Sequence, residues 1–71
     1  MKRKVKNKEF LDSLKKYFEA EVSKNVATLK LYLDDPLAVA DHEGLIESMI
    51  KLTHKIAEAE EALATLEIHF E

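Results

Sequence analysis

The residues that could do chemistry are few, and the most suggestive group is an imidazole followed by two carboxylates. His54, Glu58 and Glu61 lie four and three residues apart, so a helix would place them on one face. Histidine and carboxylates at helical spacing form the metal sites of some helical bundles. Because charged helices often carry the same pattern, we favour an exposed ion-pairing face and expect no bound metal.

Other chemistry has less support. Asp41, His42 and Glu43 are metal-ligand types in sequence, but the capped start of a helix explains them more simply. No Ser or Thr has a recognisable base at useful spacing, and phosphate-binding loops need more than the one Gly present. We therefore expect a protein that is not an enzyme and takes no cofactor.

Length and composition indicate a domain short of core. The chain has 71 residues, 46% hydrophobic and 35% charged, with one Pro and no Cys. A chain of this length buries only about 60% of the surface that its unfolded form exposes. Without Cys it has neither disulfides nor thiolate metal sites to compensate. We expect a single domain over residues 1–71 that gains stability from a partner subunit.

The single proline divides the chain into two helices. Pro36 disfavours the α region for the residue before it, so the first helix is expected over about residues 8–34. Asn7 is its predicted N-cap, because an Asn side chain can accept a hydrogen bond from a free backbone N–H of the first turn.

A Pro-containing joint is expected next, over about residues 35–41. Asp41 is the predicted N-cap of a second helix over about residues 42–70, with Gly44 inside the first turn. A joint this short fits an antiparallel pair of helices. The sequence therefore predicts an all-α helical hairpin.

The second helix carries the clearest pattern in the chain. Apolar residues follow one another at alternating steps of four and three, which is a heptad repeat of the coiled-coil kind. Ile46, Ile50, Ala57 and Ala64 flank that seam and widen it, as in a helix that touches two neighbours. The predicted seam consists of Leu45, Met49, Leu52, Ile56, Ala59, Leu63, Leu66 and Phe70.

The first helix is less regular. Its apolar residues are spaced wider than a heptad on average, so the predicted stripe drifts around the helix. Asn25 lies where a strict heptad would place a core residue. It is either buried, pairing with a symmetry mate to select register, or at the boundary facing solvent, and we favour the second. The predicted stripe consists of Leu11, Leu14, Phe18, Val22, Val26, Leu29 and Leu33.

Two helices can bury one seam between them but not two broad apolar faces. We therefore expect the hairpin to form a homo-oligomer, with a dimer that packs as a four-helix bundle favoured. The same surplus predicts a surface for a protein partner of unknown identity. Its candidate residues are Phe10, Tyr17, Leu31, Ile46 and Ile50, together with Phe70.

The charge is unevenly distributed. Five of the eleven basic residues lie in the first eight positions, which contain no acid, whereas the remaining six face fourteen acids. A solubilising N-terminus is the favoured interpretation, and contact with nucleic acid is the alternative. The acidic remainder could instead mimic a nucleic acid. The candidate nucleic-acid contacts are Lys2, Arg3, Lys4, Lys6 and Lys8.

No feature of the sequence predicts a membrane protein. The basic start is followed by Glu9 and Asp12, where a signal peptide would need an uninterrupted apolar core. No stretch approaches the 18 or so consecutive apolar residues that a spanning helix needs. A cytoplasmic protein is therefore expected.

The joint and the second helix also carry a family resemblance. Asp35-Pro36 is followed by four small or apolar residues and then by Asp41-His42-Glu43, and the helix closes on Leu63, Leu66 and Phe70. Over residues 32–71 this pattern is similar to short uncharacterised helical proteins encoded by tailed bacteriophages. The resemblance implies a phage accessory protein that acts in the cytoplasm of a bacterial host or in the virion.

Overall fold

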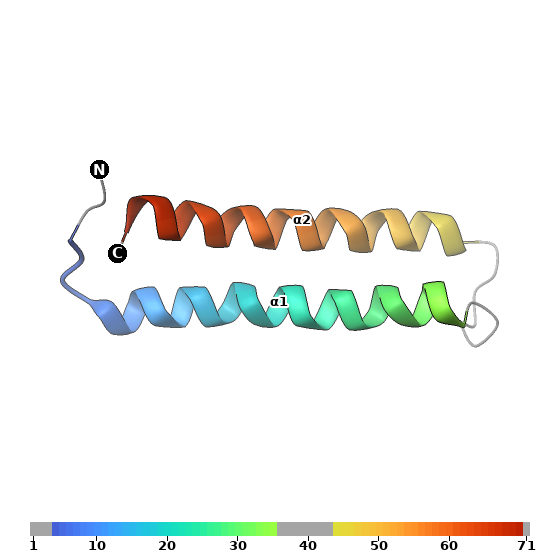
Figure 1. Ribbon diagram of the computed structural model, residues 1–71, viewed down its shortest axis with the longest axis horizontal. Coiled ribbons are helices and arrows are strands. Elements are labelled where there is room, and N and C mark those ends of the chain that lie inside the picture. The colour runs from blue at the N-terminus through green and yellow to red at the C-terminus, as the bar shows by residue number, and fades with distance from the viewer. Residues whose placement is uncertain (1–3, 36–43, 71) are drawn as a thin grey trace.

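The computed structural model describes residues 4–35 and 44–70. These residues form two helices, α1 (Lys8–Asp34) and α2 (Leu45–His69). The helices run side by side in opposite directions, so that the start of α1 and the end of α2 lie at the same end of the molecule (Figure 1). The molecule measures 49 × 19 × 15 Å. The predicted all-α class and helical hairpin are confirmed.

The ends of α1 follow from its capping residues. The side-chain oxygen of Asn7 accepts a hydrogen bond of 3.0 Å from the backbone N–H of Phe10, as its predicted role as N-cap requires. Glu9 lies in the first turn, where the positive end of the helix dipole favours an acid. At the other end, the N–H of Asp35 donates to the carbonyl of Leu31 at 2.9 Å and closes the last turn.

The second helix begins later than expected. Gly44 precedes α2 with φ −93° and ψ 15°, outside the helix, and Leu45 is the first helical residue. A glycine has low helix propensity because it loses more backbone freedom than other residues, which fits a helix that starts after it. The predicted cap Asp41 and the proline of the joint lie outside the described residues.

The heptad of α2 faces α1. All eight residues of the predicted α2 seam are buried or half-buried, and the most covered is Ala59, with 5% of its surface exposed. The flanking Ile46 and Ile50 are exposed. The two helices therefore meet along the α2 seam.

The inward residues of α1 differ from the predicted stripe. They also follow steps of four and three, because only a repeat of 3.5 residues stays in contact with the heptad of α2 along the whole pair. Three positions of the contact are therefore occupied by residues with polar groups, namely Lys15, Asn25 and Tyr32. The half-buried or buried residues at this spacing are Leu11, Lys15, Phe18, Val22, Asn25, Leu29 and Tyr32.

This register corrects four expectations. Leu14, Val26 and Leu33, placed on the predicted stripe, are exposed by 48%, 37% and 63%. Asn25 was expected to face solvent and is instead 3% exposed. The physical reason is the same for all four. Only residues of α1 with heptad spacing stay in contact with the heptad of α2 along the whole pair, so Asn25 turns inward and the three apolar residues turn outward.

The contact between the helices is thin. Among the described residues, Ala59 is the only buried apolar side chain, and no large side chain is fully buried. The other seam residues are half-buried, because each is covered by one neighbouring helix and not by two. The hairpin accordingly leaves a large share of its apolar surface in water.

Candidate protein-interaction surface

A group of exposed apolar residues lies at the start of α1. Phe10 is 72% exposed and Tyr17 is 60% exposed. Together with Ser13 and Leu14 they line a shallow hollow of about 450 Å³. Side chains this large and this exposed are found where a protein binds another surface more often than at random positions.

These residues belong to a longer, mostly exposed stripe on α1 that lies beside the seam. The stripe repeats with heptad spacing, as the inward contact does, and ends at Leu31, which is 51% exposed. We call it the outer stripe. It consists of Phe10, Ser13, Leu14, Tyr17, Ala20, Glu21, Lys24, Ala27, Thr28 and Leu31.

The only charges on the outer stripe neutralise each other. The ammonium of Lys24 lies 2.7 Å from a carboxylate oxygen of Glu21. The hydrogen bond to Glu21, and then the attraction of its charge, raise the pKa of Lys24 above its ordinary value of 10.5. Since the charges are already paired, covering this stripe with another helix would cost less than burying two separate ions.

The outer stripe opens into a groove beside α2. A second hollow of about 330 Å³ is lined by Tyr17, Phe18 and Glu21 from α1 and by Lys55, Glu58, Ala59 and Ala62 from α2. Tyr17 borders both hollows. A helix lying on the outer stripe would therefore also reach α2.

A smaller apolar surface lies near the joint. Ile46 and Ile50 are exposed on α2 and line a hollow of about 350 Å³ together with Met49, Thr53 and His54. Leu33 is exposed at the end of α1, which lies at the same end of the hairpin as the start of α2 (Figure 1). We call Leu33, Ile46 and Ile50 the joint-end surface.

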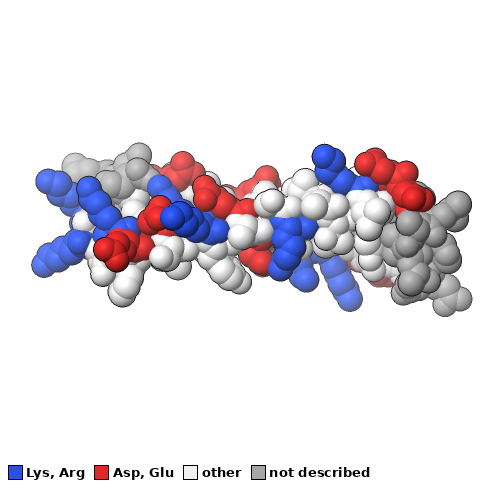
Figure 2. All heavy atoms as spheres, turned by 90° about the horizontal axis from the view of Figure 1, so that it is seen from below, with Lys and Arg blue, Asp and Glu red and all other residues white. Residues whose placement is uncertain are grey.

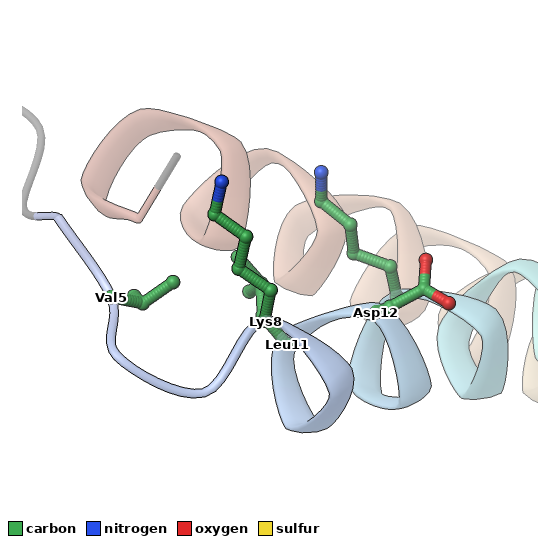
Figure 3. Close-up of a pocket in the computed structure, with 5 residues that line it drawn as sticks. Val5, Lys8, Leu11 and Asp12 are labelled. Carbon is green, nitrogen blue, oxygen red and sulfur yellow. The ribbon is translucent and has the colours of Figure 1, made fainter.

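The basic arm is attached to the start of α1. Val5 is half-buried and lines a hollow of about 370 Å³ with Lys8, Leu11, Asp12 and Lys15. Figure 3 shows the Val5 side chain directed toward the start of α1, where Lys8 and Leu11 lie. Val5 thus lies beside the first turns of α1, while the neighbouring Lys4, Lys6 and Lys8 are exposed.

The charges of the arm remain accessible. Lys4, Lys6 and Lys8 are exposed, and none of them forms an ion pair within residues 4–35 and 44–70. On the side of the molecule seen in Figure 2, basic side chains gather at the end that holds the arm. Lys2 and Arg3, also candidate contacts, lie outside the described residues.

The candidate metal ligands are not brought together. Within the described part of the chain, no group of three or more His, Asp and Glu side chains is placed to hold a metal ion, and this includes His54, Glu58 and Glu61. Asp41, His42 and Glu43 lie outside that part.

Three threonine hydroxyls form hydrogen bonds within their own helices. Those of Thr28, Thr53 and Thr65 donate to backbone carbonyls four residues earlier, at 2.8–3.0 Å. Such bonds are the usual way in which a helix accommodates threonine. These hydroxyls are therefore engaged with the backbone and not directed into a shared pocket.

Neither α1 nor α2 is both long and apolar enough to cross a membrane, in the described part of the chain. Comparisons with protein-family models, with curated proteins and with solved structures gave no significant match to this chain.

Sequence reasoning placed the exposed Phe10, Tyr17, Leu31, Ile46 and Ile50 in one candidate surface, whereas the structure divides them between the outer stripe and the joint-end surface. It missed the small residues of the outer stripe and its internal ion pair. Requiring α1 to keep the heptad period of α2 would have revealed the outer stripe, because that period fixes which residues turn outward.

Proposed function

We propose that this protein is a non-enzymatic helical interaction and assembly module. Two copies associate through the helical faces that one hairpin leaves exposed, and they pack as a four-helix bundle in which the joint around Pro36 connects the helices of each copy. The observation that carries this proposal is the thin core: Ala59 is the only buried apolar residue among the described ones. A domain below about 70–80 residues without disulfides or metal commonly needs such association.

A dimer would cover apolar side chains that a single hairpin leaves in water. Each half-buried seam residue could gain a second neighbour in a bundle, and the exposed Phe10 and Tyr17 would leave water. Each large side chain that becomes buried contributes roughly 1.5–3 kcal/mol. Several such side chains per copy exceed the cost of ordering two molecules, which is on the order of 4–15 kcal/mol.

The biological role that follows is that of an accessory protein. Once dimerised, the molecule presents an exposed helical surface to a protein of the host or of a phage, as its resemblance to small phage proteins implies. The cytoplasm of an infected bacterium is the proposed compartment, and the virion is the alternative.

Sedimentation equilibrium of the full chain over a wide concentration range tests the self-association. The expected result is a reversible dimer at micromolar concentration, with a thermal midpoint that rises with protein concentration because association stabilises the folded state. A monomer whose thermal midpoint is independent of concentration would contradict the proposal.

An alternative function uses the basic arm on nucleic acid, and the exposed Lys4, Lys6 and Lys8 favour it. Such binding would be insensitive to base sequence and would weaken as salt rises. Replacing all five basic residues of the arm by serine should abolish DNA and RNA binding at low salt if this function is correct. Equal affinity of the variant and the parent chain would exclude it.

A further inference from the structure

We propose that the second copy docks through its own α1, antiparallel to the first, so that the two outer stripes cover each other and each basic arm meets the acidic end of the other copy's α1. This inference rests on the proposed self-association and specifies its surface, orientation and register. It concerns three features to which the described residues offer no helix or ion-pair partner: the outer stripe, Lys6 and Lys8 of the arm, and the Asp34–Asp35 pair.

The outer stripe is complementary to itself in the antiparallel direction. With a two-fold axis between Ala20 and Glu21, Phe10 of one copy lies opposite Leu31 of the other. In the same register Leu14 lies opposite Ala27. At these two positions a large side chain meets an apolar one, and Ala20 beside the axis lets the helices approach closely.

The charged centre of the stripe favours the same orientation. Tyr17 lies opposite Lys24 of the second copy, and an ammonium near an aromatic face is attracted to it. A parallel pair would instead place Lys24 against Lys24 of the second copy. The antiparallel arrangement therefore keeps the two Lys24 side chains apart. It places Glu21 of each copy beside the axis, where Lys24 of the same chain neutralises its charge.

The ends of the stripe add a charge match. In the antiparallel register, Lys6 and Lys8 of one copy come near Asp34 and Asp35 of the other. Asp34 and Asp35 lie at the C-terminal end of α1, where the helix dipole disfavours acids. Neither carboxylate forms an ion pair within the described residues. A parallel pair would bring the two basic arms together and repel.

These lysines and aspartates cannot reach each other within one chain. Lys8 and Asp34 are the first and last residues of α1, about 39 Å apart at 1.5 Å per residue. Any electrostatic coupling between the two ends of α1 must therefore act between molecules. This separation makes a charge exchange a direct test of the register.

The test compares three full-length variants with the parent chain by sedimentation equilibrium at low salt. The first is Lys6→Glu with Lys8→Glu, the second is Asp34→Lys with Asp35→Lys, and the third carries all four changes. Each pair of changes improves the match with the dipole of α1, so weaker association would not reflect a weaker helix. We expect the first two variants to raise the dimer Kd by about tenfold, which corresponds to the 1.4 kcal/mol expected of a few surface ion pairs.

The variant with all four changes should recover a dimer Kd within about threefold of the parent chain, since the opposite charges meet again across the interface. High salt should abolish the differences among the four proteins, because exposed charges are screened. If either pair of changes leaves Kd unchanged, or if the four changes fail to restore it, the register is overturned while the proposed dimer stands.

A second measurement identifies the surface. Tyr17→Ser on the outer stripe should weaken the dimer by more than tenfold, whereas Ile50→Ser on the joint-end surface should leave it within about threefold. Both side chains are exposed in the hairpin, but the ring of Tyr17 also contacts that of Phe18 edge-on at 5.1 Å. Circular dichroism of each variant at low protein concentration therefore checks that the hairpin itself is intact. The reverse result would assign the dimer to the joint-end surface. A parent chain that stays monomeric would instead overturn the proposed self-association and leave the outer stripe to a different protein.

Discussion

The side-chain amide of Asn25 donates a 2.8 Å hydrogen bond to the backbone carbonyl of Glu21, one turn earlier in α1. Asn25 is the only buried polar residue among those that the structure describes. One N–H of its amide is therefore engaged within its own helix. No buried side-chain nitrogen or oxygen in the described residues lacks a hydrogen-bond partner.

Replacing Asn25 by leucine should stabilise the hairpin. The substitution keeps the size of the side chain and makes the contact apolar between Val22 and Leu29. We expect the free energy of unfolding in urea to rise by about 1–2 kcal/mol, because an apolar side chain replaces a buried polar one. Asn25→Ala, which removes volume, should not produce this gain. A less stable leucine variant would indicate that the amide has a further role in the assembly.

Enlarging Ala59 should destabilise the helix pair. Ala59 is the most covered residue of α2, so a larger side chain has to push the helices apart. Ala59→Leu is expected to cost about 1–3 kcal/mol in the free energy of unfolding. Ala57→Leu is the matched control on an exposed position two residues away, and its effect should stay within about 0.5 kcal/mol. Equal effects at both positions would contradict the observed register of α2.

Two valines of α1 test which residues face the seam. Val22 is half-buried, whereas Val26, one turn later, is exposed. Val22→Thr places a hydroxyl in the contact and should lower the free energy of unfolding by about 1 kcal/mol. Val26→Thr should change it by less than about 0.5 kcal/mol. Thermal denaturation at low protein concentration measures both, and equal losses at the two positions would support the drifting stripe, which contains both valines.

The ion pair between Glu21 and Lys24 predicts that the stability of the helix depends on pH in the alkaline range. The hydrogen bond and then the charge of Glu21 raise the pKa of Lys24 above 10.5. The stabilisation from this pair is therefore complete below pH 10.5 and is lost as the pH rises through the raised pKa. In Glu21→Gln, an NMR titration should find the pKa of Lys24 closer to 10.5.

Lys16 provides the internal control for that titration. Its pKa is raised by its hydrogen bond to Asp12 and by the charge of that carboxylate, which lies 2.9 Å away. The substitution of Glu21 should leave the pKa of Lys16 raised as in the parent chain. An unchanged pKa of Lys24 in the variant would show that the ion pair does not persist in solution.

Local signals determined much of the fold. The cap at Asn7 and the end of α1 at Asp34 were predictable because capping depends on neighbours in sequence. The inward face of α2 was predictable because its heptad is uninterrupted. The start of α2 at Leu45 was less predictable from the sequence. Asp41 is a favourable N-cap residue and indicated an earlier start, whereas the low helix propensity of Gly44 favoured a later one.

The candidate surface depended on tertiary structure. The residues of α1 alone support two apolar stripes, one through Leu14 and one through Asn25, and the sequence by itself does not decide between them. Packing against the strict heptad of α2 decides it, since only a repeat of 3.5 residues keeps two helices in contact over their length. That choice buries Asn25 and turns Leu14 outward. The sequence thus determined two amphipathic helices and an excess of apolar surface, and their packing decided where that surface lies.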